Sequence, residues 1–211
     1  MRNPDLGQAY SLDGAESCRT LYADWAETYD AGFAEAMGYR LPDLVAQAFV
    51  AAMPPEGAVL DVGAGTGLLA EALRSRGWSG PIDAVDLSAA MLSKARDKGH
   101  YRALFEADVT HPLNLPGRYA GIVSSGTFTH GHVGPEAFGP LLSICVPGAV
   151  LALSVNAGIW DELGFADALA ALGSRVAGIT LTEAPIYGDG ALQRDPEHAK
   201  DRAMIVTVRL S

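Results

Sequence analysis

Cysteine and basic residues are both scarce in this chain of 211 residues. The two cysteines, Cys18 and Cys145, lie far apart in the sequence and therefore indicate neither a disulfide framework nor a zinc site. Lysine and arginine number 15 against 25 aspartate and glutamate residues, which gives a formal net charge of −10. Because nucleic-acid phosphates are bound through basic surfaces, we expect no nucleic-acid partner.

Long apolar runs are also absent. No uninterrupted run reaches the roughly 20 residues that a membrane-spanning helix needs. The most apolar stretch, ICVPGAVLALSV, is broken by Pro147 and Gly148. The first ten residues, MRNPDLGQAY, hold no apolar core of a signal peptide. These absences predict a cytoplasmic protein that has no membrane partner.

The sequence does contain alternating strand-like and helix-like segments from Val59 onward. Helix-like patterns lie between most of the apolar runs, and the last of these patterns extends over residues 160–173. The alternation predicts an α/β fold with a doubly wound, mainly parallel, seven-stranded sheet of the Rossmann-like type. The apolar runs are Val59–Val62, Ile82–Val85, Tyr101–Phe105, Gly121–Ser125 and Val150–Val155, followed by two C-terminal strands.

The two ends of the chain depart from this alternation. The C-terminal strands, GITLTEAP at 178–185 and MIVTVRLS at 204–211, are separated by a polar segment without an apolar face. They are therefore expected to form an antiparallel pair at the sheet edge. Residues 1–53 have helical patterns, and Pro-Pro-Glu-Gly at 54–57 follows them. We expect one domain, with a helical segment over 1–53 packed on a core over 54–211.

A glycine-rich stretch, VLDVGAGTG, follows the first predicted strand. Gly63, Gly65 and Gly67 allow a tight strand-to-helix turn, and the start of the following helix offers free N–H groups to a ligand. A tight turn without any ligand is the alternative. The spacing G-x-G-x-G differs from the dinucleotide pattern G-x-G-x-x-G, because Leu68 stands at the third glycine position. Asp61, just before the loop, favours a ligand that carries an ammonium group.

LDVGAGTG resembles motif I of the class I S-adenosylmethionine-dependent methyltransferases. The resemblance implies a methyl-transferring enzyme that uses S-adenosylmethionine and releases S-adenosylhomocysteine. It places the methionine half and the ribose of this cofactor against the glycine loop, with Asp61 near the amino group. The cofactor-binding residues that it implies in this stretch are Asp61, Gly63, Ala64, Gly65 and Gly67.

Two further acids follow the second and third predicted strands. Asp86 lies about 20 residues beyond the glycine loop, where an acid is placed to accept hydrogen bonds from ribose hydroxyls. The alternative is an acid that merely stabilises a helix N-terminus. In ALFEADVTHP, Asp108 resembles the family's acid for the adenine amino group, although a polar loop acid would look the same. Further cofactor contacts are expected from Leu87, Met91 and Val109.

The segment SSGTFTHGHVGP after the fourth strand is expected to reach the methyl acceptor. The resemblance implies cofactor contacts there from Ser124, Ser125 and Gly126. His130 and His132 are candidate catalytic bases, because histidine takes up protons near neutral pH. They could equally be ordinary loop residues, and no third ligand completes a metal site. Expected acceptor contacts are Thr127, Phe128, Asn156 and Trp160, with Thr129 beside them.

The N-terminal segment YADWAETYD places Tyr22, Trp25 and Tyr29 on one helical face. Such an aromatic stripe often belongs to a core. It also resembles the N-terminal lid helix of small-molecule methyltransferases, which implies that Tyr22 and Tyr29 contact the cofactor. GTFTHGHVGP and VNAGIW further resemble the Williams–Beuren-region methyltransferase-like group, a resemblance that names no substrate.

The function expected from these patterns is methyl transfer to a small-molecule oxygen or nitrogen acceptor by in-line displacement. No Asn-Pro-Pro-Tyr element follows the fourth strand, which speaks against methylation of nucleic-acid bases. Two alternatives stay open, a non-catalytic S-adenosylmethionine-binding regulatory module and a NAD(P)-dependent oxidoreductase. The sequence also leaves a homodimer open.

Overall fold

The computed structural model describes residues 6–12 and 14–211. Positions 1–5 and 13, which belong to the predicted helical segment over 1–53, lie outside the described residues. Among the helices in the described part of the chain, none is both long and apolar enough to cross a bilayer.

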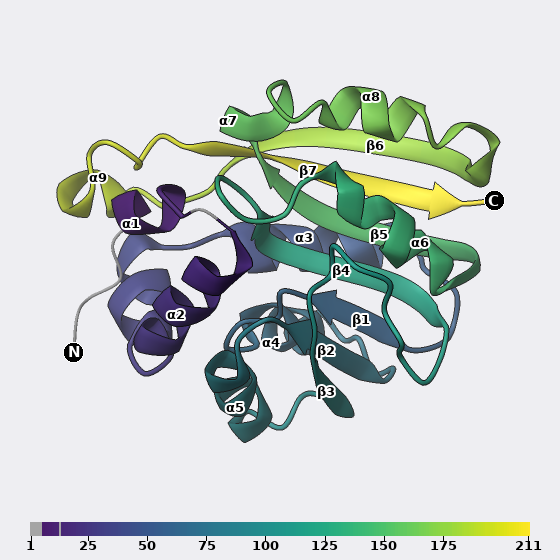
Figure 1. Ribbon diagram of the computed structural model, residues 1–211, viewed down its shortest axis with the longest axis horizontal. Helices are drawn as coiled ribbons and strands as arrows, with labels where there is room; N and C mark the ends of the chain where they lie inside the picture. The colour runs from purple at the N-terminus through teal and green to yellow at the C-terminus, as the bar shows by residue number, and fades with distance from the viewer. Residues whose placement is uncertain (1–5, 13) are drawn as a thin grey trace.

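A seven-stranded sheet forms the centre of the protein, as the sequence predicts, with the order β3-β2-β1-β4-β5-β7-β6 (Figure 1). The pairs among β1 to β5 are parallel, whereas β7 runs antiparallel to both β5 and β6. The predicted antiparallel C-terminal edge is therefore confirmed. The strands are β1 (Val59–Val62), β2 (Ile82–Asp86), β3 (Ala103–Glu106), β4 (Tyr119–Phe128), β5 (Cys145–Asn156), β6 (Val176–Pro185) and β7 (Arg202–Leu210).

The strand order reverses between β1 and β4, which lie side by side in the sheet. From this point β2 and β3 continue to one side, and β5 continues to the other. In open α/β sheets a crevice forms beyond the carboxyl ends of the strands at such a reversal, and ligands bind in it. The fold therefore places the glycine loop, which follows β1, at the position where a ligand is expected.

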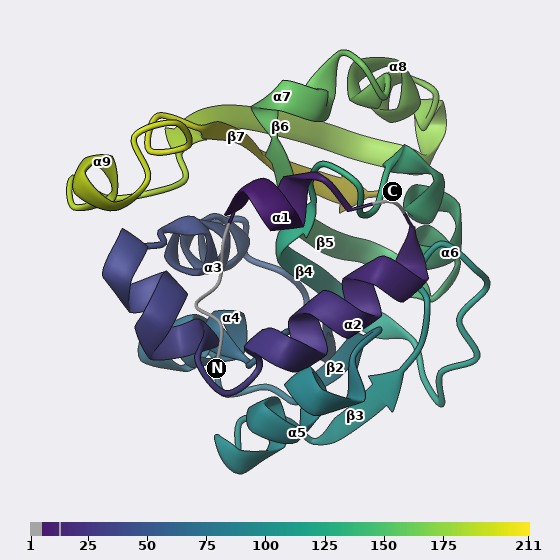
Figure 2. The same ribbon diagram turned by 60° about the vertical axis from the view of Figure 1, so that its left-hand side comes forward.

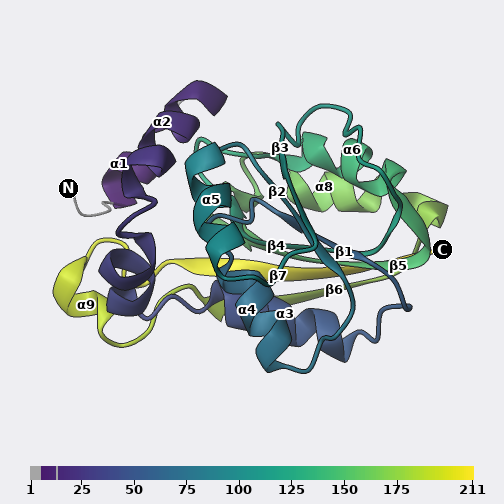
Figure 3. The ribbon, with the colours of Figure 1, turned by 90° about the horizontal axis from the view of Figure 1, so that it is seen from below.

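Helices cover both faces of the sheet (Figure 3). One face packs against α3, α4 and α5, and the other packs against α6 and α8. The helical elements are α1 (Leu6–Tyr10), α2 (Ala15–Trp25), the π-helix η1 (Tyr29–Glu35), α3 (Leu41–Ala51), α4 (Leu68–Ser75), α5 (Ala89–Asp97), the 3₁₀ turn η2 (Pro135–Ala137), α6 (Phe138–Ser143), α7 (Ala157–Trp160), α8 (Phe165–Ala170), the 3₁₀ turn η3 (Gly173–Arg175) and α9 (Ala191–Arg194).

Apolar side chains fill the space between the sheet and each helical layer. Val45 and Phe49 of α3 and Leu73 of α4 are buried on one face, while Leu141 of α6 and Phe165 of α8 are buried on the other. Helix α3 thus packs directly on the sheet, although it lies within the N-terminal segment 1–53. Burial of such side chains stabilises the layers by roughly 1.5–3 kcal/mol each.

The first helices, α1 and α2, lie beyond one end of the sheet (Figures 1 and 3), and Figure 2 views them from that end, in front of the strands. Arg19 of α2 donates from Nε to the carbonyl of Leu87 at 3.3 Å, which ties this helix to the end of β2. Lys94 of α5 forms an ion pair with Glu27 at 2.6 Å. These contacts hold the N-terminal helices over the carboxyl ends of the strands.

One helix prediction needs correction. A single helix over residues 160–173 was expected, but the structure has the short helices α7 and α8 with a turn between them. Gly164 at the start of α8 has a φ of 68°, a left-handed conformation that interrupts a helix. The polar segment between β6 and β7, expected to lack a helix, contains the single-turn helix α9.

Candidate functional site

A cavity of about 340 Å³ lies beyond the carboxyl ends of β1, β2 and β4, and we call it the glycine-loop cavity. Its size is typical of small-molecule sites, which range over roughly 300–1,000 Å³. The predicted residues that line it are Tyr22, Tyr29, Gly63, Ala64, Gly65, Asp86, Leu87, Met91, Asp108, Val109, Ser125, Gly126, Thr127 and His132. The topological reversal therefore brings most of the predicted cofactor residues together.

The three glycines of the loop all have positive φ angles but different surroundings. A Cβ atom on Gly63 would lie 2.0 Å from Oγ1 of Thr127, and one on Gly67 would lie 3.1 Å from the ring of Tyr101. A Cβ atom on Gly65 would meet no protein atom within 4 Å. Two of the glycines therefore let the loop approach other parts of the protein, and only Gly65 leaves open space at the cavity.

Asp86, at the end of β2, is fixed by backbone donors. Its Oδ2 accepts from the N–H of Gly65 at 2.8 Å, and its Oδ1 accepts from the N–H of Ser88 at 2.8 Å. Burial raises the pKa of this carboxyl group, although the backbone N–H bonds oppose the shift. Both oxygens keep a lone pair, so the carboxylate could accept hydrogen bonds from a ligand in the cavity.

Asp61, at the end of β1, lies behind the lining of the glycine-loop cavity and is 1% exposed. Its Oδ2 accepts from the hydroxyl of Tyr101 at 2.7 Å, while its Oδ1 has no partner among the described residues. Burial raises the pKa of Asp61 to about 7, which the bond from Tyr101 partly opposes. An unpartnered buried carboxylate oxygen is costly, so this atom offers a place for an added donor.

Asp108 and Val109 line the opposite side of the glycine-loop cavity. Oδ1 of Asp108 accepts from the backbone N–H of Thr110 at 2.9 Å and from its hydroxyl at 2.7 Å. Burial acts to raise the pKa of Asp108, but these bonds and the nearby His111 lower it overall. The carboxylate is thus ionised and already turned toward its own loop.

Tyr22 and Tyr29 line the cavity from α2 and η1, whereas Trp25 between them is buried in a small core with Met91. The predicted aromatic stripe thus contributes to both the cavity and the core. The hydroxyl of Tyr22 lies 3.0 Å from Nε2 of His132. This contact joins the N-terminal helices to the loop after β4.

The two candidate bases occupy different positions. Nδ1 of His132 lies 2.6 Å from the carbonyl of His130, which requires a proton on Nδ1, so Nε2 accepts from Tyr22. Burial lowers the pKa of His132, so its ring is neutral at pH 7. The ring of His130 instead packs on Tyr10, with ring centroids 5.0 Å apart, and does not line the glycine-loop cavity. His132 is therefore the candidate base that lies at the cavity.

A second, smaller cavity of about 40 Å³ adjoins the first, and we call it the tyrosine cavity. The two cavities share Tyr22, Tyr29, Tyr39 and Gly126 as a common wall. The other residues that line the tyrosine cavity are Ala9, Tyr10, Trp25, Phe33, Leu41, Phe128, Thr129, Ser154, Asn156, Ile186 and Tyr187.

The residues predicted to contact the methyl acceptor do not all line the same cavity. Thr127 lines the glycine-loop cavity, while Phe128 and Asn156 line the tyrosine cavity. Trp160 lines neither, because its ring stacks on Phe165 at 5.8 Å. Ser124 is also outside both cavities, where its hydroxyl donates to the carbonyl of Val62 at 2.7 Å.

Several residues at the site carry no sequence signal of their own. Thr66 in the glycine loop donates to Oδ1 of Asp30 in η1 at 2.5 Å, and Lys98 forms an ion pair with the same carboxylate at 2.7 Å. Tyr101, the partner of Asp61, comes from a segment that reads as a plain strand. Thr66 could have been predicted as a site residue only from its location within the glycine motif. No sequence pattern marks Tyr39 or Tyr187 as site residues.

Metal-ligating side chains do not cluster in the described part of the chain, where no three His, Cys, Asp or Glu residues could hold a metal ion. Both cysteines are free and buried. Cys18 lines the glycine-loop cavity, and burial raises the pKa of its thiol.

Known proteins resemble this chain in sequence and in fold. A family model described as a methyltransferase domain matches residues 33–177. Methyltransferase-like protein 27 from Homo sapiens is 32% identical over 158 residues, which cover 72% of this chain and 60% of that protein.

Two solved structures resemble the fold at 18% sequence identity each. The [4+2]-cyclase SpnF has a TM-score of 0.65 and aligns over 94% of this chain and 97% of its own. DhpI in complex with S-adenosylhomocysteine has a TM-score of 0.63 and aligns over 93% of this chain and 97% of its own.

Proposed function

This chain belongs to the class I S-adenosylmethionine-dependent methyltransferases, and we propose that it moves the methyl group to a small-molecule acceptor. One observation carries the proposal. A cavity of cofactor size at the strand reversal shares a wall of tyrosines with a second, smaller cavity. The cofactor would occupy the glycine-loop cavity, and the reacting end of the acceptor would enter the tyrosine cavity.

The residues of the glycine-loop cavity fit S-adenosylmethionine. Asp86 would accept hydrogen bonds from the ribose hydroxyls, because backbone N–H groups hold both of its oxygens in place. The open space beside Gly65 leaves room for the ligand close to the backbone. The unpartnered Oδ1 of Asp61 would receive a hydrogen bond from the cofactor's ammonium group, through a water molecule where the distance requires one.

Adenine would lie between the ends of β2 and β3. Leu87 and Val109 supply apolar surface there, and Asp108 supplies an ionised acceptor for the adenine amino group. The predicted contacts from Met91, Ser125 and Gly126 are consistent with this placement, since all three line the same cavity.

The bound cofactor supplies a methyl group that its sulfonium already activates for transfer. The chain's own residues then need to align the acceptor, exclude water and take up a proton where the acceptor loses one. Alignment alone contributes up to about 7–11 kcal/mol in well-oriented reactions. Tyr22, held by His132, stands on the wall between the two cavities, where the acceptor atom would meet the methyl group.

His132 is the proposed proton acceptor. Its ring is neutral near pH 7, and Nε2 already accepts a hydrogen bond from Tyr22. A proton leaving the acceptor could pass through the Tyr22 hydroxyl to Nε2 of His132. Such a base contributes on the order of 10²–10⁴-fold to the rate when the acceptor must lose a proton. His130 lines neither cavity and is therefore not the proposed proton acceptor.

The experiment that tests the cofactor is a set of calorimetric titrations of the protein with S-adenosylmethionine, S-adenosylhomocysteine and NAD. We expect micromolar binding of the first two ligands and none of NAD. Binding of NAD alone would contradict the proposal and favour an oxidoreductase.

Catalysis requires a separate measurement, because the fold does not guarantee methyl transfer. Formation of S-adenosylhomocysteine is followed by mass spectrometry with panels of small amines, alcohols and phenols. Formation of S-adenosylhomocysteine with one of these panels would support the proposal that the protein catalyses methyl transfer. Tight cofactor binding without product in any panel would favour the regulatory module.

A further inference from the structure

The tyrosine cavity gathers an unusual share of the chain's aromatic residues. Of seven tyrosines in the sequence, five line this one cavity. They come from α1, α2, η1, the segment before α3, and the segment after β6, so distant parts of the sequence meet here. These five are Tyr10, Tyr22, Tyr29, Tyr39 and Tyr187.

The rings form a connected wall. The ring centroids of Phe33 lie 5.9 Å from Tyr39 and 6.1 Å from Tyr187, and those of Tyr39 and Tyr187 are 6.1 Å apart. Tyr29 packs on Phe33 at 5.2 Å and on Tyr22 at 6.4 Å. An aromatic face carries partial negative charge, so a cavity lined by such rings attracts cations.

Carboxylates lie near two of these rings, and Lys98 pairs with one of them, Asp30. Burial first, and then nearby carboxylates, raise the pKa values of Tyr10 and Tyr29, so both stay protonated. The carboxylates are Asp201 for Tyr10, and Asp30 and Asp86 for Tyr29. Among the described residues that line the cavity, none is lysine, arginine or histidine. An anionic ligand would therefore find no charged partner among the lining residues, whereas a cationic one would gain from the aromatic rings.

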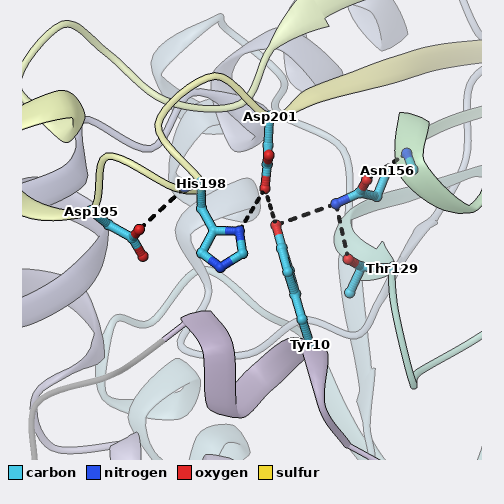
Figure 4. Close-up of polar contacts among 7 residues, drawn as sticks. Tyr10, Thr129, Asn156, Asp195, His198 and Asp201 are labelled. Atoms are coloured by element: carbon cyan, nitrogen blue, oxygen red, sulfur yellow. Dashed lines mark hydrogen bonds and ion pairs between the residues drawn. The ribbon is translucent and has the colours of Figure 1, made fainter.

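The back of the tyrosine cavity is a polar cluster centred on Tyr10 (Figure 4). The hydroxyl of Tyr10 donates to Oδ2 of Asp201 at 3.0 Å and accepts from Nδ2 of Asn156 at 3.3 Å. Asn156 also donates to Thr129, and Nδ1 of His198 lies 3.3 Å from Oδ2 of Asp201. The cluster places a carboxylate directly behind the wall of the cavity and holds the Tyr10 ring in position.

The size of the cavity limits what can enter. A volume of about 40 Å³ holds roughly three water-sized groups, since one water needs about 10–15 Å³ on this measure. The shared wall with the glycine-loop cavity faces the place assigned to the cofactor. Only a small head group fits, and the rest of a larger acceptor would have to extend through the shared wall.

We propose that the tyrosine cavity binds the ammonium head group of a small alkylamine, which makes an amine the acceptor class of this enzyme. Before transfer the ammonium would lose one proton through the Tyr22 hydroxyl to Nε2 of His132, and the freed lone pair would form the N–C bond as the S–C bond of the cofactor breaks. The link to methyl transfer rests on the function proposed above, but the binding of an alkylammonium ion does not. The five tyrosines and Thr129 that line the cavity supply aromatic rings and hydroxyl groups to such a head group.

The proposal is tested by titrating the protein, saturated with S-adenosylhomocysteine, with three probes of four heavy atoms each. The probes are isopropylammonium, 2-propanol and acetate, which have similar sizes and differ in charge. We expect isopropylammonium to bind about tenfold more tightly than 2-propanol, because cation–π contacts add to the same apolar contacts. We expect no binding of acetate.

Two variants separate the aromatic ring from the hydroxyl at one position that lines only the tyrosine cavity. Tyr187→Phe keeps the ring and should hold the isopropylammonium affinity within about twofold, while Tyr187→Leu should weaken it about fivefold or more. Circular dichroism and a titration with S-adenosylhomocysteine check that each variant is folded.

Equal affinities for isopropylammonium and 2-propanol, or tighter binding of acetate, would overturn the proposal. So would an unchanged isopropylammonium affinity in a folded Tyr187→Leu variant. Failure of the cofactor proposal would look different, because S-adenosylhomocysteine itself would not bind. The probes are then titrated into the protein alone, where the same order of affinities is expected.

Discussion

The glycine-loop cavity and the tyrosine cavity lie side by side but are built in different ways. The first is formed mainly by the ends of parallel strands, with backbone N–H groups and carboxylates in fixed places. The second is formed by side chains from α1, α2, η1, β5 and the segment after β6. One cavity depends on a short local motif, and the other depends on how distant segments pack together.

This difference matters for specificity. The proposed cofactor would be held largely by a strand-end motif, whose contacts come from the backbone and from acids at fixed positions. Side chains from separate segments can change independently, so they are suited to select the acceptor. The structural resemblance to a [4+2]-cyclase agrees with this division, since the fold is shared by proteins of different chemistry.

The largest effect is expected within the glycine loop itself. Gly63→Ala should lower the free energy of unfolding by about 3 kcal/mol, because its Cβ would clash with Thr127 and its φ is 64°. Gly65→Ala has only the strained φ and should lower it by about 1 kcal/mol. Urea unfolding of both variants measures the two values. Equal losses would show that the approach to Thr127 does not constrain the loop.

The second largest effect is expected on the affinity for S-adenosylhomocysteine, the ligand assigned to the glycine-loop cavity. Asp86→Ala should weaken S-adenosylhomocysteine binding about 30-fold, because a hydrogen-bonded charged group contributes roughly 1.5–3 kcal/mol. Calorimetric titration measures this change, and thermal melting shows whether the fold persists. The matched control is Asp97→Asn, which alters an exposed carboxylate at the end of α5. An Asp86 variant that binds as well as this control would remove Asp86 from the site.

A third effect concerns pH. The pKa of Asp61 is about 7 in the folded protein against a usual value of 3.8, so the folded state holds the proton more tightly. The contribution of Asp61 to stability is therefore present below about pH 4 and is lost as the pH rises toward 7. The slope reaches at most about 1.4 kcal/mol per pH unit.

Urea unfolding between pH 4 and pH 8 tests this effect with Asp61→Asn as the comparison. Asparagine does not titrate, so the variant should lose less stability than the wild type as the pH rises. Parallel curves for the two proteins would mean that Asp61 keeps an ordinary pKa in the folded protein.

The smallest effect is expected on the wall that the two cavities share. Tyr22→Phe removes the hydroxyl that donates to Nε2 of His132 and should cost about 1 kcal/mol of unfolding free energy. Its effect on S-adenosylhomocysteine affinity should be much smaller than that of Asp86→Ala. If Tyr22→Phe weakens cofactor binding more than Asp86→Ala does, the tyrosine belongs to the cofactor site and not to the shared wall.

The same contrast explains what the sequence could predict. The sheet and its antiparallel edge follow from local patterns. The meeting of most of the predicted cofactor residues at one cavity does so too, since a strand, a glycine turn and a helix are consecutive. Asp86 could be predicted from its distance to the glycine loop. The placement of Asp61 behind Tyr101 could not be predicted, because Tyr101 is 40 residues away and reads as part of a plain strand.

The tyrosine cavity was even harder to anticipate. Tyr10 and Tyr187 come from opposite ends of the chain and meet at this cavity, and nothing in the sequence near either residue marks a site. Trp160 is a different case, because its position after β5 predicts an acceptor contact whereas its ring stacks on Phe165 outside both cavities. Side-chain positions that depend on long-range packing need the structure.

The most direct test of the division between the cavities is a crossed titration of two variants with two ligands. S-adenosylhomocysteine and isopropylammonium are each titrated into Asp86→Ala and Tyr187→Leu. We predict that Asp86→Ala loses affinity for S-adenosylhomocysteine alone and that Tyr187→Leu loses affinity for isopropylammonium alone. If Asp86→Ala binds S-adenosylhomocysteine like the wild type, or if each folded variant weakens both ligands equally, the assignment of the two cavities is contradicted.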